Sequence, residues 1–104
     1  MILIFGGTTE GRTAAETLDE AGQPFYYSTR GTLQEVTCRN MTRLTGNMDS
    51  EKIISFCREH DIRLIIDAAH PFAQQLHLNI FLAAKELTIK VVRLERIYPE
   101  LSEE

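Results

Sequence analysis

The fold is decided by the opening stretch of the chain, Ile2-Leu3-Ile4-Phe5-Gly6-Gly7-Thr8-Thr9-Glu10-Gly11-Arg12. Four apolar residues lead directly into a glycine pair, and a helical pattern then begins. A buried strand that ends in a tight turn and feeds a helix has this pattern. Backbone N–H groups at the start of a helix attract an anion, most often a nucleotide phosphate. The stretch therefore predicts a nucleotide-binding turn.

The glycine spacing of this turn is G-G-x-x-x-G, which differs from the strict G-x-G-x-x-G dinucleotide fingerprint. Gly6 or Gly7 can still take a positive φ angle, and Gly11 lets the helix pack close to the sheet. Thr8 and Thr9 add hydroxyl donors. We expect cofactor contacts from the whole turn: Gly6, Gly7, Thr8, Thr9, Glu10 and Gly11. The alternative is a plain strand-to-helix turn.

Strand and helix patterns alternate along the rest of the chain. Apolar or aromatic runs predict strands at residues 2–5, 25–29, 41–44, 64–66 and 89–94. Helices are predicted at residues 9–21, from Asp49 or Ser50 to residue 60, and from Pro71 onward. Residues 32–40 fit a loop, a short helix or a strand. We expect one α/β domain with a Rossmann-like, doubly wound parallel sheet, about five strands in the order 3-2-1-4-5, and helices on both faces.

The end of the second predicted strand indicates the type of nucleotide. Ligands of such sheets bind at the carboxyl ends of the strands, beside the first strand, where the order reverses. At this edge the chain reads Ser28-Thr29-Arg30, without the acidic residue that usually holds the ribose of NAD. Two hydroxyls beside a guanidinium suit a 2′-phosphate and predict NADPH. The alternative is an exposed turn arginine.

The fourth predicted strand ends at Asp67, and His70-Pro71 follows at the same edge. His70 is expected either to contact a ligand or to cap the helix that Pro71 starts at its N1 position. Asp67 is expected to orient neighbouring backbone, whereas His60 and His77 are expected at the surface. The helix should carry one apolar stripe made of Phe72, Leu76, Ile80, Ala83, Ala84 and Leu87.

Composition argues against several classes of protein. The 104 residues fit one domain, and a net charge of −4 without a basic cluster argues against nucleic acid as a partner. No apolar run approaches the roughly 20 residues that span a bilayer. The start lacks the basic region of a signal peptide, so a cytoplasmic location is expected. Cys38 and Cys57 have neither metal-site nor redox-pair spacing and are expected to be reduced thiols.

No pattern assigns a catalytic residue. The chain shows no nucleophile elbow, no triad pattern and no set of residues with metal-ligand spacing. No lysine follows a tyrosine at the fourth position, which disfavours a short-chain nucleotide-sugar enzyme. The last strand closes with Arg93-Leu94-Glu95-Arg96. These arginines either bind a carboxylate-rich substrate or form a salt-bridged exit segment.

Three motifs together resemble one family. Gly6–Arg12, Asp67-Ala68-Ala69-His70-Pro71-Phe72-Ala73 and Arg93-Leu94-Glu95-Arg96 resemble precorrin-6A reductase and its cobalt-precorrin counterpart. The resemblance extends over essentially the whole chain. Ala69 stands where the family usually has threonine, and Ile97-Tyr98 replaces a more usual proline and tryptophan.

The resemblance implies an NADPH-dependent enzyme that reduces one double bond of a corrin-precursor macrocycle, a tetrapyrrole, on the route to cobalamin. It also implies a second α/β lobe, so that residues 1–104 form the first, NADPH-binding lobe. His70 and Pro71 would contact the cofactor. The expected substrate contacts are Arg12, His70, Phe72, Arg93 and Arg96. A non-catalytic nucleotide-binding or sensing module, or a fragment of another Rossmann-type oxidoreductase, is the alternative.

Overall fold

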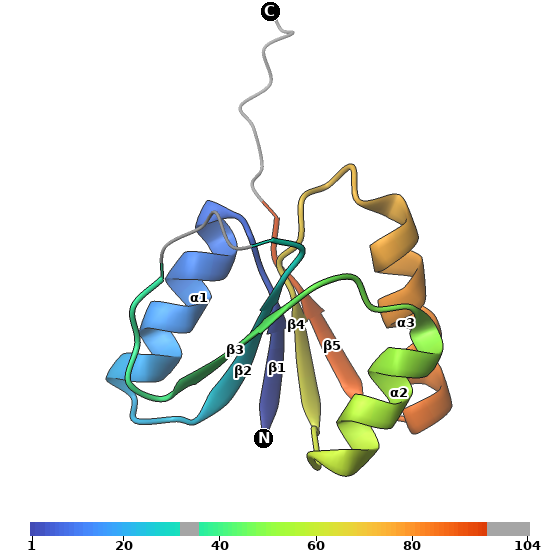
Figure 1. The fold of residues 1–104 in the computed structure, drawn as a ribbon, viewed down its shortest axis with the longest axis horizontal. Coiled ribbons are helices and arrows are strands. Elements are labelled where there is room, and N and C mark those ends of the chain that lie inside the picture. Colours follow the sequence, from blue (N-terminus) through green and yellow to red (C-terminus); the bar gives the residue numbers. More distant parts are fainter. Residues whose placement is uncertain (32–35, 96–104) are drawn as a thin grey trace, which may run out of the picture.

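The computed structural model describes residues 1–31 and 36–95, whose strands form one parallel sheet (Figure 1). The strands are β1 (Ile2–Phe5), β2 (Phe25–Thr29), β3 (Met41–Thr45), β4 (Leu64–Asp67) and β5 (Lys90–Arg93). Their order is β3-β2-β1-β4-β5, and every neighbouring pair is parallel. The predicted order is confirmed, and the continuous apolar run of β1 is explained by its central place between two strands.

Helices cover both faces of this sheet, as the sequence predicts. The helix α1 (Thr9–Glu20) lies on one face, and α2 (Ser50–Glu59) and α3 (Gln74–Leu87) lie on the other (Figure 1). Thr8 caps α1 by accepting the Gly11 N–H at 3.0 Å, and Asp49 caps α2 by accepting the Lys52 N–H at 2.8 Å. These side-chain caps explain where both helices start. No helix within residues 1–31 and 36–95 is long and apolar enough to cross a membrane.

Two hydrophobic cores lie on the two faces of the sheet. The core under α2 and α3 contains Leu3, Phe5, Ile53, Cys57, Ile62, Ile65, Ile80 and Ala83. The core under α1 contains Ile4, Ala15, Phe25, Tyr27, Val36, Ile66 and Ala68. Alternate residues of β1 enter opposite cores, as the two-residue period of a strand requires. Both cores hold the strand ends, and therefore the turns that follow them, in fixed positions.

The connection between β2 and β3 contains neither helix nor strand in its described residues, 30–31 and 36–40. Among the described elements, α1 therefore covers its face of the sheet alone. A groove of about 660 Å³ lies between α1 and the end of β5, and Ile66 of β4 lines it too. Its lining is Glu10, Thr13, Ala14, Thr17, Leu18, Ile66, Arg93, Leu94 and Glu95.

The start of α3 corrects one expectation. The helix begins at Gln74, so Pro71 is not its N1 residue, and Phe72 is 82% exposed instead of lying on the apolar stripe. The Ala73 N–H donates to the His70 carbonyl at 2.9 Å, which closes a separate turn before the helix. The rest of the predicted stripe is confirmed, since Ile80, Ala83 and Ala84 are buried and Leu76 and Leu87 pack against the core.

Candidate functional site

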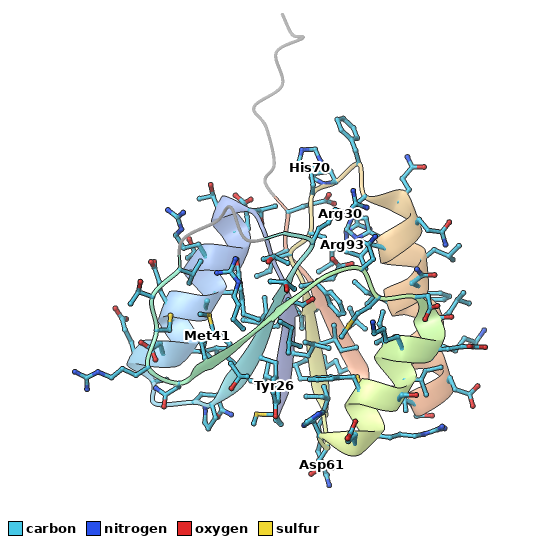
Figure 2. The ribbon with its side chains drawn as sticks, viewed as in Figure 1. Tyr26, Arg30, Met41, Asp61, His70 and Arg93 are labelled. Carbon is cyan, nitrogen blue, oxygen red and sulfur yellow. The ribbon has the colours of Figure 1, made fainter. Side chains whose placement is uncertain are left out.

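Four segments meet at the carboxyl edge of the sheet. They are the glycine turn after β1, Arg30 after β2, the turn from Asp67 to Phe72 after β4, and the end of β5 at Arg93. Figure 2 shows Arg30, His70 and Arg93 toward this end of the molecule and Asp61 at the opposite end. The edge beside the central strand is where open α/β sheets bind their ligands. It is therefore the candidate site.

The glycine turn is shaped by Tyr27, which the sequence analysis did not assign to the site. A Cβ on Gly6 would overlap the Tyr27 ring, and a Cβ on Gly11 would lie 2.9 Å from the Gly6 Cα. Gly7 has φ +95°, and no atom lies within 4 Å of the place a Cβ would take. The turn therefore packs tightly against the sheet at Gly6 and Gly11 and exposes bare backbone at Gly7.

The Tyr27 hydroxyl lies directly under this turn. It accepts the Gly7 N–H at 3.2 Å, and the Tyr27 side chain is buried. Burial raises the pKa of Tyr27 above its usual value of 10.0, while the Gly7 N–H and the positive charges of Arg43 and Arg12 oppose that rise. One N–H of the predicted phosphate cradle is therefore held by the protein itself, in an electropositive neighbourhood.

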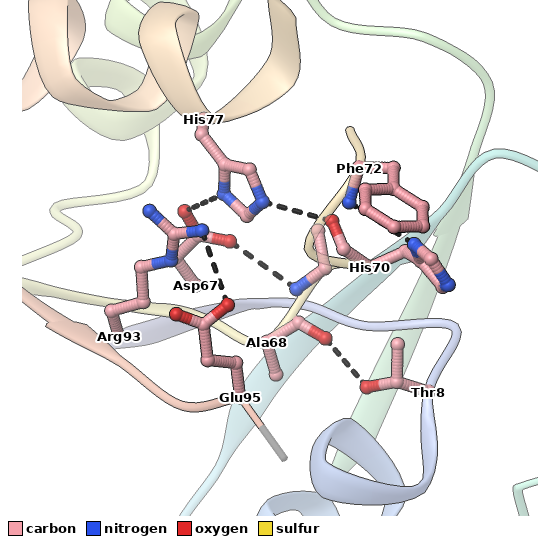
Figure 3. A network of polar contacts seen from close by, with 9 residues as sticks. Thr8, Asp67, Ala68, His70, Phe72, His77, Arg93 and Glu95 are labelled. Carbon is pink, nitrogen blue, oxygen red and sulfur yellow. Dashed lines mark hydrogen bonds and ion pairs between the residues drawn. The ribbon is translucent and has the colours of Figure 1, made fainter. Parts of the chain in front are cut away.

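Thr8 joins the glycine turn to the end of β4. Its hydroxyl donates to the Ala68 carbonyl at 2.5 Å (Figure 3). The same oxygen accepts the Gly11 N–H. The single hydroxyl proton of Thr8 is thus used within the fold. Thr9 is exposed as the first residue of α1, Glu10 is half-buried beside it, and Arg12 is exposed. The start of α1 is therefore fixed relative to β4.

The end of β2 offers fewer ligand groups than its sequence suggests. Ser28 and Thr29 are buried, and the Thr29 hydroxyl donates to the Gly31 carbonyl at 2.5 Å and accepts from Arg43 at 3.2 Å. Arg30 is exposed, and its Nε donates to Asn47 at 3.1 Å. Arg43 was missed, and its Nε is buried without a hydrogen-bond partner among the described residues. The accessible cation here is Arg30.

The turn after β4 is organised by a histidine that was expected at the surface. The His77 side chain is only 10% exposed, its Nδ1 lies 2.6 Å from Asp67 Oδ2, and its Nε2 lies 2.9 Å from the His70 carbonyl (Figure 3). Asp67 also accepts the Ala69 N–H at 3.2 Å, so its expected role in orienting backbone is confirmed. His60 is half-buried, with Nδ1 at 3.0 Å from the Tyr26 hydroxyl.

His70 and Phe72 form the exposed rim of the site. His70 Nδ1 accepts the Phe72 N–H at 3.1 Å, and the two rings lie 5.2 Å apart, while Pro71 is half-buried between them. Because Nδ1 accepts this bond, Nε2 is the ring nitrogen that carries the proton of the neutral ring. The rim therefore offers one N–H donor beside an aromatic face.

The end of β5 completes the edge. Arg93 is partly exposed and lies 3.4 Å from Glu95, and the Leu94 N–H donates to the Asp67 carbonyl at 3.0 Å. The ion pair between Arg93 and Glu95 agrees with the salt-bridged exit segment, one of the two alternatives for this stretch. Arg96 lies outside the described residues. Within residues 1–31 and 36–95 no three His, Cys, Asp or Glu side chains come together in a way that could hold a metal ion.

Comparison with known proteins gives the family. The precorrin-6x reductase family CbiJ/CobK matches residues 1–103. The chain belongs to this family. It is 32% identical over 98 residues to the cobalt-precorrin-6A reductase of Priestia megaterium and 33% identical over 100 residues to the precorrin-6A reductase of a Sinorhizobium species. The resemblance stated from the motifs is thereby confirmed.

The family members are longer than this chain. The matches cover 92% and 91% of this chain but only 38% and 37% of those two relatives. A solved structure named CobK precorrin-6A reductase has the same fold, with a TM-score of 0.86 and 24% identity over 99% of this chain and 42% of that one. The chain thus spans about two fifths of the length of the family members it matches.

Proposed function

We propose that this chain is the NADPH-binding lobe of a reductase that reduces one double bond of precorrin-6A or cobalt-precorrin-6A to the 6B form. The observation that carries the proposal is the meeting of a glycine turn, a helix N-terminus and the His70–Phe72 rim at one sheet edge, in a chain of the precorrin-6x reductase family. The chain covers only 38% of the length of the Priestia megaterium relative, which supports a second lobe that closes the site.

The residues present fit a dinucleotide. The open space over Gly7 and the start of α1 suit a diphosphate, because the helix dipole favours an anion there. The N–H groups of Gly7 and Gly11 are already bonded to Tyr27 and Thr8. Arg30 would meet the 2′-phosphate, since its guanidinium is exposed at the end of β2. His70 and Pro71 would border the nicotinamide half, because they follow β4 on the other side of the central strand.

NADPH supplies the hydride when it is bound, so the chain's own residues have to bind and orient rather than act as nucleophiles. The rings of His70 and Phe72 would pack against the flat macrocycle, with His70 Nε2 as a hydrogen-bond donor. Arg12 and Arg93 would meet carboxylates of the substrate. The location we propose is cytoplasmic, where NADPH is available.

Nucleotide titration tests this proposal. NADPH fluorescence should change saturably when the chain is added, NADH should bind more weakly, and Arg30→Ala should reduce that difference. Phe72→Ala should leave NADPH affinity unchanged but weaken binding of the precorrin substrate, because Phe72 is almost fully exposed. Leu78→Ala is the matched control, since it removes an apolar side chain that is 48% exposed on α3.

Two outcomes would contradict the proposal. If neither NADPH nor NADH binds, the glycine turn does not form a nucleotide site in this chain. If NADPH binds but the precorrin binds neither to this chain nor to this chain joined to the proposed second lobe, the result favours the non-catalytic nucleotide-binding module.

A further inference from the structure

His77 closes a hydrogen-bonded chain between α3 and the turn after β4 (Figure 3). Its two ring nitrogens lie 2.6 Å from Asp67 Oδ2 and 2.9 Å from the His70 carbonyl oxygen. The side chains of His77 and Asp67 are only 10% and 4% exposed. The contact with Asp67 is therefore largely shielded from water and must be satisfied by the protein, whereas the contact with the His70 carbonyl lies at the exposed rim.

The geometry sets the number of protons in this pair. A carbonyl oxygen only accepts hydrogen bonds, so His77 Nε2 must carry a proton to pair with His70. The contact between Nδ1 and Asp67 Oδ2 needs a second proton, which either atom can hold. Asp67 and His77 together therefore hold two protons and have no net charge. Loss of one proton would leave a buried negative charge and two facing lone pairs.

The same contacts fix the rim of the site. The His70 carbonyl accepts from His77 and also from the Ala73 N–H at 2.9 Å. The His70 ring is in turn held by the Phe72 N–H at its Nδ1. The backbone of His70 is thus tied to α3 on one side, while its ring and the Phe72 ring are oriented on the other.

We propose that His77 is a positioning residue of the candidate site, which holds the His70 ring and Phe72 in place through the His70 carbonyl and Asp67. The role rests on the proposed function, because the ligand edge is the edge that binds NADPH and the precorrin. A neutral pair suits this place, since both ligands are anionic and a buried negative charge beside them would repel them.

Two variants test this role. His77→Phe keeps a ring of similar size but leaves the Asp67 carboxylate with the Ala69 N–H as its one remaining hydrogen-bond donor among the described residues, so it could unfold the chain. The double variant Asp67→Asn with His77→Phe also removes the buried charge and should stay folded. His60→Gln is the matched control. Like His77, His60 is half-buried and hydrogen-bonded to another side chain, in its case the Tyr26 hydroxyl. It lies next to Asp61, at the opposite end of the sheet from the candidate site (Figure 2).

The first readout is amide hydrogen exchange at Phe72 and Ala73. The double variant should lose protection at both amides and bind NADPH about tenfold more weakly, as expected for the loss of about one well-formed hydrogen-bonded contact. The control should change neither. Unchanged exchange and unchanged affinity in the folded double variant would overturn the positioning role.

The second readout is NADPH affinity in the folded double variant, because a merely structural role would change stability without changing that affinity. A folded double variant with lower stability but unchanged NADPH affinity would overturn the role alone. Absence of NADPH binding by the wild type would instead overturn the proposed function, and this role with it.

Discussion

Among single residues, Gly6 is the one that the packing of the site restricts most. Its backbone lies against the Tyr27 ring, and its N–H donates to the Ser28 carbonyl at 2.8 Å. The sequence predicts that this glycine is part of a phosphate-binding turn. The structure adds a second reason for glycine at this position, which is its close contact with the sheet. A side chain here would disturb the fold before it could affect a ligand.

Gly6→Ala should therefore destabilise the protein by about 1–3 kcal/mol, the usual range for overpacking a well-packed interior. Urea unfolding measures this change. Gly31→Ala is the control, because no contact within 4 Å of its added Cβ is found in the described part of the chain and its φ is not positive. The control should stay within about 0.5 kcal/mol of the wild type. Equal stability of the two variants would show that Tyr27 moves aside at little cost.

The site residues that sequence reasoning missed are those whose roles depend on a distant partner. His77 is expected at the surface from its local pattern, but its Nδ1 pairs with Asp67 on β4. In the sequence Tyr27 is indistinguishable from other strand residues, because its hydrogen bond with the Gly7 N–H depends on where the fold places the glycine turn. The available signal was Asp67 itself, since a carboxylate at the end of a buried strand needs donors. Finding the donor required the fold.

At the scale of elements, the helix ends show which boundaries can be predicted from the local sequence. Asp49 caps α2, which is one of the two predicted starts, and Gly22 takes a positive φ of 72° just after α1. The helix α3 has no side-chain cap at its start and ends at Leu87, and the C-cap residue Thr88 has φ 57° and ψ 46°. A β-branched residue is strained in this left-handed region.

Thr88→Gly should stabilise the protein by about 0.5–1 kcal/mol, because the relief of left-handed strain exceeds the entropy that glycine adds to the unfolded chain. The melting temperature should rise by a few degrees. Thr17→Gly is the matched control, since Thr17 is exposed in the interior of α1 and glycine there should lower stability by about 0.3 kcal/mol. A fall in both variants would mean that Thr88 is not strained.

The one misplaced helix start has a clear physical cause. The spacing of residues 72, 76 and 80 fits a helical stripe, and proline suits a first turn. In the structure the His70 ring and carbonyl accept the N–H groups of Phe72 and Ala73, which gives this segment a turn of its own. Periodicity predicts which residues share a helix face, but it does not predict a turn that is held by contacts of the His70 ring and carbonyl.

At the scale of the whole molecule, the strand order and the helix layers follow from the alternation of patterns. The apolar run of β1 indicated a central strand, and the order 3-2-1-4-5 was the natural expectation for a doubly wound sheet. Residues 32–40 gave no clear pattern, and their described part, 36–40, has neither helix nor strand. Cys57 lies in the core under α2 and α3, where it is 2% exposed, while Cys38 is half-buried.

The two thiols should therefore report opening of the whole molecule. Burial raises the pKa of Cys57 to about 11 and also raises the pKa of Cys38. At pH 8 a thiol reagent should modify Cys38 first and Cys57 only as fast as the protein unfolds. Because the folded state favours the neutral thiol, Cys57 should make stability fall as the pH rises from about 9 toward 11. Equal labelling rates in the native protein would contradict this, and urea should abolish the difference.

The central position of β1 also has a consequence during protein synthesis. This strand is made before the others, yet one of its two neighbours is β4, whose Asp67 pairs with Phe5. At about 5–20 residues per second, a ribosome needs several seconds to reach that partner. Until then this apolar strand has at least one unpaired edge, and an unpaired apolar strand is prone to aggregate.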